Sequence, residues 1–423
     1  MTTIYRTLGT AAVLLATVAA AVGSDEVSED WPQWRGPKAD GRPTVTGIKR
    51  DWSGGLTKLW AVTDICKGKN SAAWSAPSLK GDRLVITGRY SDKDVVFCLN
   101  PDTGALVWKK AYAAPGKCQY GTGPRATPTI DGDRVYTFGC MGHLACWRLA
   151  DGAQVWMKKV EALGGKRPYW GHSSSPLIWK KTVIVQAGGK ALVLALDKMT
   201  GKPVWKSMTG KAGYAAPVIA TVAGKPQLIV FTDSLLVGLD PDDGRRLWSH
   251  VHKTAFGMNC TTPIVLGERL LVSSSEYGKQ GGTALLKLRP NGVTPVWRTQ
   301  ALGAAHNDPV VVDGHIYAYT GWSFNPKELK CLDLATGAVR WATAAAGGPG
   351  NVVLVDGLLL CLDNRGRLSL AKPSPKAFTR ITQFQAITGH PVWTGPVIVR
   401  DRIYVRFANT LICYRLKDTP APK

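Results

Sequence analysis

Short runs of alternating apolar and polar residues follow one another along most of the chain. Residues 82–86, 133–136, 315–317 and 401–404 are examples, and each begins at a charged residue or a histidine. A period of two is typical of strands with one buried face, and no long segment has apolar residues at the helical spacing of 3.6. The pattern therefore predicts an all-β fold.

A unit of about 43 to 52 residues recurs along the chain. It contains a Thr-Gly, Asp-Gly or Asn-Gly pair, which favours a tight hairpin turn, and a tryptophan four or five residues after the glycine. The same tryptophan position recurs in a strand near the N-terminus. We call these residues the repeat tryptophans and expect them to pack between neighbouring units: Trp60, Trp108, Trp156, Trp205, Trp248, Trp297 and Trp341.

A proline marks the start of the first strand in seven units, where a missing N–H is tolerated. These prolines are Pro77, Pro128, Pro176, Pro217, Pro263, Pro309 and Pro396. Residues 351–354 form an eighth first strand without proline. The seventh unit lacks its tryptophan, and Trp393 lies too close to Pro396 to sit on an outer strand. The last unit stops after three strands, and residues 57–62 supply the fourth. We therefore predict an eight-bladed β-propeller of four-stranded antiparallel blades, closed by an N-terminal strand.

The N-terminus reads as a secretory signal peptide, because an uncharged run from residue 7 to 23 follows Arg6 and ends in small residues. A retained anchor is the competing interpretation, although the run is short for a bilayer. We predict a signal peptide at 1–23, an N-terminal extension at 24–55, a propeller at 56–416 and a C-terminal tail at 417–423. The mature chain is expected to be periplasmic or secreted, without a transmembrane span, and monomeric.

The chain is strongly basic, with 53 Lys and Arg against 30 Asp and Glu and a net charge of +23. The charges are spread singly rather than in blocks, and no nucleic-acid motif is present, so we do not expect nucleic-acid binding. Attraction to acidic envelope polymers or anionic lipids remains open.

Nine cysteines leave at least one thiol unpaired. Cys98, Cys146, Cys331 and Cys413 fall at one strand position of different repeats, where Ala195, Gly238 and Leu286 stand in others, so they are interpreted as small core residues. Cys66 and Cys118 lie in loops beside the first repeat. A disulfide between these two is our hypothesis.

The repeats resemble the pyrroloquinoline quinone (PQQ) repeat family, whose pattern is well shown by residues 142–146 with Gly152 and Trp156. The resemblance covers residues 31 to 416. The opening Trp31-Pro32-Gln33-Trp34-Arg35-Gly36-Pro37 is similar to the start of a secreted subgroup of such propellers. The family includes quinoprotein alcohol dehydrogenases and the non-enzymatic lipoprotein subunit of the outer-membrane β-barrel assembly machinery.

Candidate ligand-binding residues precede the first-strand prolines, where they should ring the axis. Unlike the core, these positions differ between blades, as a ligand site requires. Arg125 could hold a carboxylate, Trp74 and Trp393 could stack on a planar group, and His306 with Asp308 could move a proton. A polar, water-filled channel is the alternative. The candidates are Trp74, Tyr120, Arg125, Trp170, His172, Tyr214, Asn259, Cys260, His306, Asn307, Asp308 and Trp393, with Ser173 at the same level.

The resemblance implies two functions. In the first, the chain is a non-catalytic scaffold of the cell envelope that presents its loop face to a protein or peptide and needs no cofactor. In the second, it is a PQQ-dependent or PQQ-related oxidoreductase, similar to alcohol dehydrogenases, that uses PQQ with calcium. The family's adjacent cysteine pair is missing, and few oxygen ligands for calcium are present. Zinc spacing and a nucleophile elbow are also missing, so we favour the first function and assign no catalytic residue or metal site.

Overall fold

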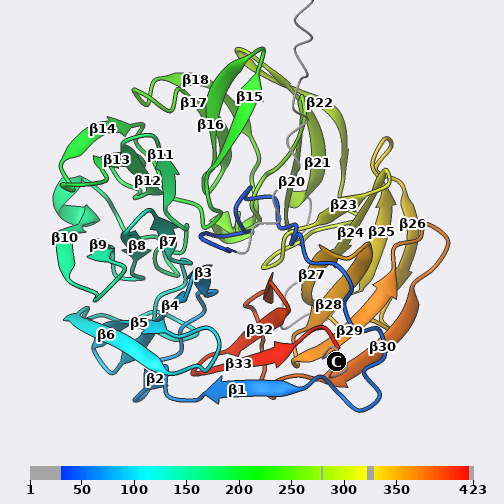
Figure 1. Ribbon diagram of the computed structural model, residues 1–423. Coiled ribbons are helices and arrows are strands. Elements are labelled where there is room, and N and C mark those ends of the chain that lie inside the picture. Colours follow the sequence, from blue (N-terminus) through cyan, green and yellow to red (C-terminus); the bar gives the residue numbers. More distant parts are fainter. Residues whose placement is uncertain (1–29, 278–279, 322–327, 419–423) are drawn as a thin grey trace, which may run out of the picture.

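The chain forms eight antiparallel sheets that stand around a central axis like the blades of a propeller (Figure 1). This computed structural model describes residues 30–277, 280–321 and 328–418, so the predicted signal peptide and the last five residues lie outside the described part. Each sheet has four antiparallel strands, and the first carries an additional strand, β2 (Cys66–Lys67), parallel to β4. The predicted all-β, eight-bladed propeller is confirmed.

In the first four blades, the strands follow one another in chain order from the axis outward. Blade 1 comprises β3 (Ser78–Lys80), β4 (Arg83–Tyr90), β5 (Lys93–Leu99) and β6 (Leu106–Ala113). Blade 2 comprises β7 (Thr129–Asp131), β8 (Arg134–Phe138), β9 (His143–Arg148) and β10 (Gln154–Lys159). Blade 3 comprises β11 (Leu177–Trp179), β12 (Thr182–Gln186), β13 (Val193–Asp197) and β14 (Pro203–Ser207). Blade 4 comprises β15 (Val218–Val222), β16 (Lys225–Phe231), β17 (Leu235–Leu239) and β18 (Arg246–Val251).

Blades 5 to 7 follow the same order, and blade 8 takes its outermost strand from near the N-terminus. Blade 5 comprises β19 (Ile264–Leu266), β20 (Arg269–Tyr277), β21 (Gln280–Arg289) and β22 (Gly292–Thr299). Blade 6 comprises β23 (Val310–Val312), β24 (His315–Tyr319), β25 (Leu329–Asp333) and β26 (Val339–Thr343). Blade 7 comprises β27 (Gly350–Val355), β28 (Leu358–Asp363), β29 (Arg367–Lys372) and β30 (Thr379–Gln385). Blade 8 comprises β31 (Val397–Val399), β32 (Arg402–Phe407), β33 (Thr410–Arg415) and β1 (Lys58–Val62).

In the described part of the chain, two short 3₁₀ helices lie in loops between blades, namely η1 (Val160–Leu163) and η2 (Ala255–Gly257). Seven innermost strands begin directly after a proline, as Pro77 before β3 illustrates. Within its blade, each of these edge strands pairs with one neighbouring strand only, so the missing N–H costs no ladder hydrogen bond inside the blade. Within the described ranges, no helix has the length and apolar character needed to cross a membrane.

The two ends of the chain close the ring in blade 8. Strand β1 lies antiparallel to β33 as the outermost strand, with Trp60 opposite Cys413 (Figure 1). Blade 8 therefore has four strands like the other blades, although its outermost strand and its three inner strands lie more than 300 residues apart in the chain. Closure in this way removes an exposed sheet edge.

The repeat tryptophans bridge neighbouring blades. The indole of Trp108 on β6 lies against Gly152 of blade 2, where an added Cβ would come within 2.5 Å of the ring. Its Nε1 donates a hydrogen bond of 2.9 Å to the Leu149 carbonyl. Trp60, Trp156 and Trp297 repeat both contacts with the next blade. Each such tryptophan also sits at a shift in strand register, so a β-bulge recurs at this position.

The sequence repeat places Leu286 at the strand position that Cys98 holds in blade 1, and this assignment is corrected. Leu285, not Leu286, lies opposite Trp297. The cause is local, because the turn at Gly292 in blade 5 is followed by one more residue before its tryptophan than in the other repeats.

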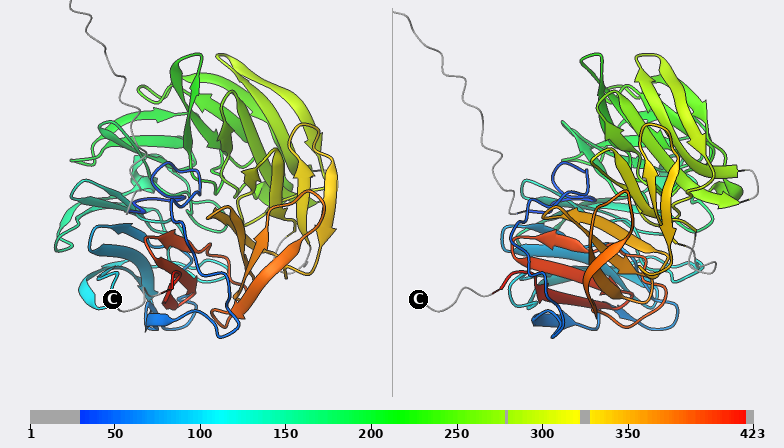
Figure 2. Two further views of the ribbon diagram at one scale, coloured as in Figure 1. Left: turned by 45° about the vertical axis from the view of Figure 1, so that its right-hand side comes forward. Right: turned by 90° about the vertical axis from the view of Figure 1, so that its right-hand side faces the viewer.

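The N-terminal segment, residues 30–56, crosses the central opening before it reaches β1 (Figure 1, dark blue; Figure 2). It begins beside blade 1, where Trp31 exchanges backbone hydrogen bonds with Leu79. It passes to blade 6, where the Arg42 guanidinium donates to the Val311 carbonyl. The N-terminal segment thus crosses the central opening on this face.

Candidate functional site

An aromatic cavity opens at the axis on the face formed by the loops that precede the innermost strands. We call it the axial cavity, and its volume is about 180 Å³. Its walls come from seven of the eight blades and from the N-terminal segment. The lining residues are Trp34, Trp74, Tyr120, Arg125, Trp170, Ser173, Ser175, Tyr214, Ala216, Met258, Cys260, Thr262, His306, Asp308 and Trp393.

The structure brings nine of the twelve candidate residues to this cavity: Trp74, Tyr120, Arg125, Trp170, Tyr214, Cys260, His306, Asp308 and Trp393. The other three lie behind its wall. His172 is buried with its ring 4.6 Å from that of Phe138. The Asn259 amide donates to backbone carbonyls that include that of Thr232, and Asn307 lines a small neighbouring cavity.

Trp393 is the centre of the aromatic wall. Its ring lies 4.8 Å from that of Trp74, 5.4 Å from that of Tyr120 and 5.2 Å from that of His306, with which it stacks. The placement of Trp393 at the inner end, rather than on an outer strand, therefore agrees with the sequence argument. Because Trp74 and Trp393 contact each other at a tilt of 59°, no slot for a planar ring exists between them.

A short stretch of the loop between β6 and β7, residues 118–121, anchors several walls of the cavity; we call it the hub. The Arg125 guanidinium donates to the Gln119 and Gly121 carbonyls at 2.6 Å and 2.8 Å. Trp74 Nε1 donates to the Tyr120 carbonyl at 2.7 Å. From the loop between β10 and β11, Trp170 Nε1 donates to Gln119 Oε1. The conformation of the hub thus sets where the aromatic rings stand.

The floor of the axial cavity comes from the N-terminal segment. Trp34 Nε1 donates to Thr262 Oγ1 at 2.8 Å. Arg35 forms a 2.6 Å ion pair with Asp308, and both side chains are about nine-tenths buried. The sequence argument did not assign Trp34 or Arg35 to the site. The only available signal was the dense Trp and Pro content of residues 31–37, which has no strand pattern.

The pair His306 and Asp308 is not arranged for proton transfer. One carboxylate oxygen of Asp308 pairs with Arg35, and the other accepts the Thr262 N–H at 2.7 Å. His306 instead stacks on Trp393, and burial, together with the charge of Arg125, lowers its pKa to about 4. A neutral imidazole and a fully engaged carboxylate are structural groups at this site. These contacts do not support proton transfer between His306 and Asp308, which stays a prediction.

A second cavity, the rim cavity, adjoins the axial cavity and shares Tyr120, Trp170, Tyr214 and Met258 with it. Its volume is about 780 Å³, and its walls carry the basic residues Lys166, Arg167 and Lys211. Tyr169 and Phe256 stand on its edge, each 70% exposed. Tyr120 and Phe256 have left-handed backbone conformations, with φ of 59° and 61°. Such conformations are costly for bulky residues and cluster at functional loops.

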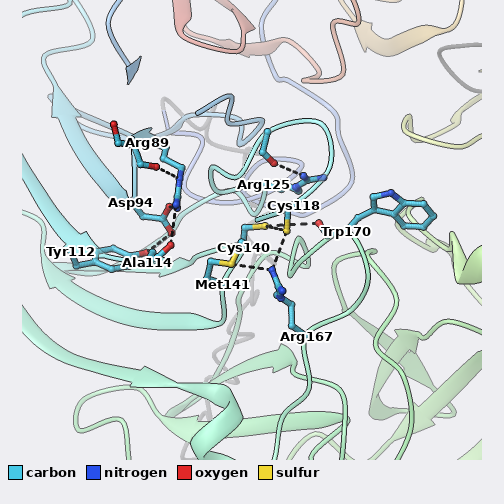
Figure 3. Close-up of polar contacts among 12 residues, drawn as sticks. Arg89, Asp94, Tyr112, Ala114, Cys118, Arg125, Cys140, Met141, Arg167 and Trp170 are labelled. Carbon is cyan, nitrogen blue, oxygen red and sulfur yellow. Dashed lines mark hydrogen bonds and ion pairs between the residues drawn. The ribbon is translucent and has the colours of Figure 1, made fainter. Parts of the chain in front are cut away.

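The cysteine arrangement differs from the hypothesised pairing. Cys66 and Cys118 are both free thiols. Cys66 lies on β2 with its sulfur near the Ala408 carbonyl, whereas Cys118 Sγ is 3.1 Å from Cys140 Sγ (Figure 3). The Cys66–Cys118 disulfide is therefore wrong. The sequence placed both cysteines in loops of one face, but it could not show that the turn between β8 and β9 brings Cys140 to Cys118.

The axial residues do not fit a calcium-bound quinone. Calcium binds several oxygen ligands, commonly with carboxylates among them. The carboxylate of Asp308 is already engaged on both oxygens, and the amide oxygens of Asn259 and Asn307 are buried behind the wall. Among the residues that the structure describes, no group of three or more His, Cys, Asp or Glu side chains could hold a metal ion.

Comparison with known proteins matches the chain to one family. The family described as outer membrane protein assembly factor BamB matches residues 52–137, 92–343 and 262–418. The BamB of Yersinia pestis is 24% identical over 236 residues, which are 52% of this chain and 57% of that protein. The chain therefore matches little more than half the length of this curated relative.

Solved structures share the fold at low sequence identity. The crystal structure of BamB from Moraxella catarrhalis superposes with a TM-score of 0.61 and 14% identity over 87% of this chain and 99% of that one. The quinohemoprotein alcohol dehydrogenase from Comamonas testosteroni also gives 0.61, with 13% identity over 94% and 82%. The fold is thus common to proteins named as assembly factors and as quinone enzymes, so the site's own residues must decide between them.

Proposed function

The chain belongs to the family described as outer membrane protein assembly factor BamB, and from this premise we propose that it is a non-catalytic scaffold of the cell envelope, acting in the periplasm or outside the cell. Its loop face, where the axial and rim cavities open, binds a protein or peptide partner. The observation that supports this most directly is the composition of that face. Aromatic residues surround the cavities, and Arg125, His306 and Asp308 of the axial cavity are occupied in structural contacts.

The chemistry of the loop face indicates the partner. Exposed Tyr169 and Phe256 provide large apolar contacts at the rim. Aromatic residues of this kind dominate the binding energy of many protein interfaces. Lys166, Arg167 and Lys211 add positive charge beside them. We expect a partner segment that combines apolar side chains with acidic ones, because charge complementarity steers association.

Site-specific photo-cross-linking tests this function. A photoreactive amino acid replaces Tyr169 or Phe256 on the rim, and Val204, which is 52% exposed on the outer strand β14, serves as the control position. In the envelope fraction of producing cells, we expect one discrete adduct from both rim positions and none from Val204. Excess unmodified protein should compete it away. Identical adducts from Val204, or no rim adduct, would contradict the proposal.

The same purified protein tests the enzymatic alternative. PQQ with calcium is added at saturating concentration, and the melting temperature and dye-linked alcohol oxidation are measured. We expect no shift and no turnover. A clear shift that disappears in Arg125→Ala would favour the oxidoreductase and overturn the scaffold.

A further inference from the structure

Cys118 and Cys140 come together where three loops of neighbouring blades meet (Figure 3). Cys118 is half-buried in the loop between β6 and β7, and Cys140 is fully buried in the turn between β8 and β9. Their sulfur atoms are 3.1 Å apart. The third loop, between β10 and β11, passes directly over them. An added Cβ on Gly171 would lie 2.1 Å from Cys140 Sγ and 3.0 Å from Cys118 Sγ, so only glycine fits there.

Arg167 gives this pair its charge environment. Its Nη1 lies 3.3 Å from Cys118 Sγ and 3.0 Å from Met141 Sδ, and it also donates to the Lys117 carbonyl (Figure 3). A guanidinium in this position favours a thiolate at Cys118. Because this cation contacts both Cys118 Sγ and Met141 Sδ, its positive charge disfavours a metal ion bound by these sulfurs.

We propose that Cys118 and Cys140 are a redox pair that closes to a disulfide by thiol–disulfide exchange with an external disulfide, either of a small thiol or of a protein. The Cys118 thiolate attacks one sulfur of the external disulfide and releases the first thiolate. Cys140 then loses its proton to solvent, attacks Cys118 Sγ and displaces the second thiolate. The protein loses two hydrogen atoms in total, and the external disulfide is reduced to two thiols.

The two sulfurs have different roles in this sequence. The hydrogen bond from Cys140, and then the charges of Arg125 and Arg167, lower the pKa of Cys118 to about 6 against the opposing effect of burial. The hydrogen bond to Cys118 and burial raise the pKa of Cys140 well above its usual value. The accessible, acidic thiol is therefore the attacking group, and the buried thiol is the resolving one.

Oxidation would act on the aromatic site through the hub. Cys118 is the first residue of the hub, whose next residues receive hydrogen bonds from Trp74, Arg125 and Trp170. The bond would fix this segment to the turn between β8 and β9. The redox state of the pair would thus set the rigidity of the wall shared by both cavities, whatever ligand the face binds.

Peptide mapping of the native protein tests the pair. The protein is incubated with glutathione disulfide, its remaining thiols are alkylated, and it is digested with trypsin without reduction. We expect a linked species of residues 118–125 and 135–148, which disappears on reduction. The second peptide contains both Cys140 and Cys146, so fragmentation must locate the bond at Cys140. Alkylation of both Cys118 and Cys140 after this incubation, or a bond from Cys118 to any other cysteine, would overturn the proposal.

A spectroscopic measurement tests the coupling to the site. Trp74 and Trp170 hydrogen-bond to the hub, so we expect tryptophan fluorescence to shift on oxidation in the wild-type protein. The shift should vanish in Cys118→Ser and in Cys140→Ala and persist in Cys66→Ser, the matched control. Since the mapping uses the unchanged protein, a misfolded Cys140→Ala leaves the proposal testable. An equal shift in Cys118→Ser would contradict the coupling.

Discussion

A small residue faces most of the repeat tryptophans across the strand pair. It is cysteine opposite Trp60, Trp108, Trp156 and Trp341, alanine opposite Trp205 and glycine opposite Trp248. At Gly238, an added Cβ would lie 2.2 Å from the Trp248 ring, so only glycine fits at this position. Burial raises the pKa of Cys98 to about 12. These cysteines are therefore inert core residues, unlike Cys118.

Two turn glycines allow the cost of a left-handed backbone to be measured apart from the cost of a clash with the repeat tryptophan. Gly152 has φ of 71° and lies against Trp108, whereas Gly132 has φ of 59° with nothing within 4 Å of an added Cβ. We expect Gly132→Ala to lower the free energy of unfolding by about 1 kcal/mol, the cost of the left-handed conformation. Gly152→Ala should lower it by about 3 kcal/mol, because overpacking is added. Urea unfolding measures both, and equal effects would show that the indole moves aside freely.

His252 should make the protein sensitive to acid. It is 2% exposed, with its ring 2.9 Å from Ser274 Oγ, and burial, followed by the charges of Arg298 and His250, lowers its pKa to about 4. The unfolded chain, with a histidine pKa near 6.5, binds more protons than the native state between these values. The contribution of His252 to the free energy of unfolding is therefore fully present above pH 6.5 and is lost as the pH drops toward 4.

The acid effect of His252 is measurable by difference. From pH 7 to pH 5, we expect this residue to lower the free energy of unfolding by about 2 kcal/mol. Urea unfolding of the wild type and of His252→Gln at both pH values isolates the contribution, because the other histidines are common to both proteins. The variant should lose about 2 kcal/mol less than the wild type on acidification. An identical loss would assign the sensitivity to other groups.

At the scale of single elements, the N-terminal segment compensates for the tryptophan that blade 7 lacks. In blade 7, the repeat tryptophan is missing and Thr382 takes its place in the register. The backbone N–H of Trp52 donates to Thr382 Oγ1, and its fully buried ring packs edge-on against Phe384 at 5.6 Å. The N-terminal segment thus supplies an indole at the blade that lacks one.

Blade 1 contains a buried ion pair that ties its hairpin to the loop carrying the hub. Arg89 on β4 and Asp94 on β5 are 2.7 Å apart and at most 2% exposed. Arg89 also donates to the Ala114 carbonyl at the start of that loop (Figure 3). Breaking a buried pair leaves an uncompensated charge, which costs far more than losing a surface pair.

Replacement of Asp94 should therefore be severe. We expect Asp94→Asn to lower the free energy of unfolding by about 3 to 5 kcal/mol, because the Arg89 charge stays buried without its partner. The control is Asp151→Asn, which removes the exposed partner of Arg148 and should leave stability nearly unchanged. Chemical unfolding measures both variants. If the double variant Arg89→Met, Asp94→Asn were no more stable than Asp94→Asn, the unpaired charge would not be the cause.

For the whole molecule, the sequence predicted the scaffold well because the scaffold repeats. Glycine turns, first-strand prolines and tryptophans recur at equivalent positions, so the strands assigned in one repeat support the strands assigned in the next. The axial residues were found by the same alignment, as their place before each proline fixed their level. Arg35 and Trp34 could not be placed, because they lie in a segment without strand pattern whose course depends on distant partners such as Asp308 and Thr262. The contact of Cys118 with Cys140 likewise depends on loop conformation.

The N-terminal segment has two separable roles, which truncation distinguishes. Residues 30–42 cross the central opening and form the floor of the axial cavity, whereas β1 closes the ring through its pairing with β33. A protein beginning at residue 43 should keep a closed ring and unfold in one transition at a lower urea concentration, since Asp308 loses its partner Arg35. A protein beginning at residue 63 exposes the edge of β33, so we expect it to self-associate in light scattering. A monomeric, equally stable product of the second truncation would show that the ring does not need β1, and that the segment serves the site alone.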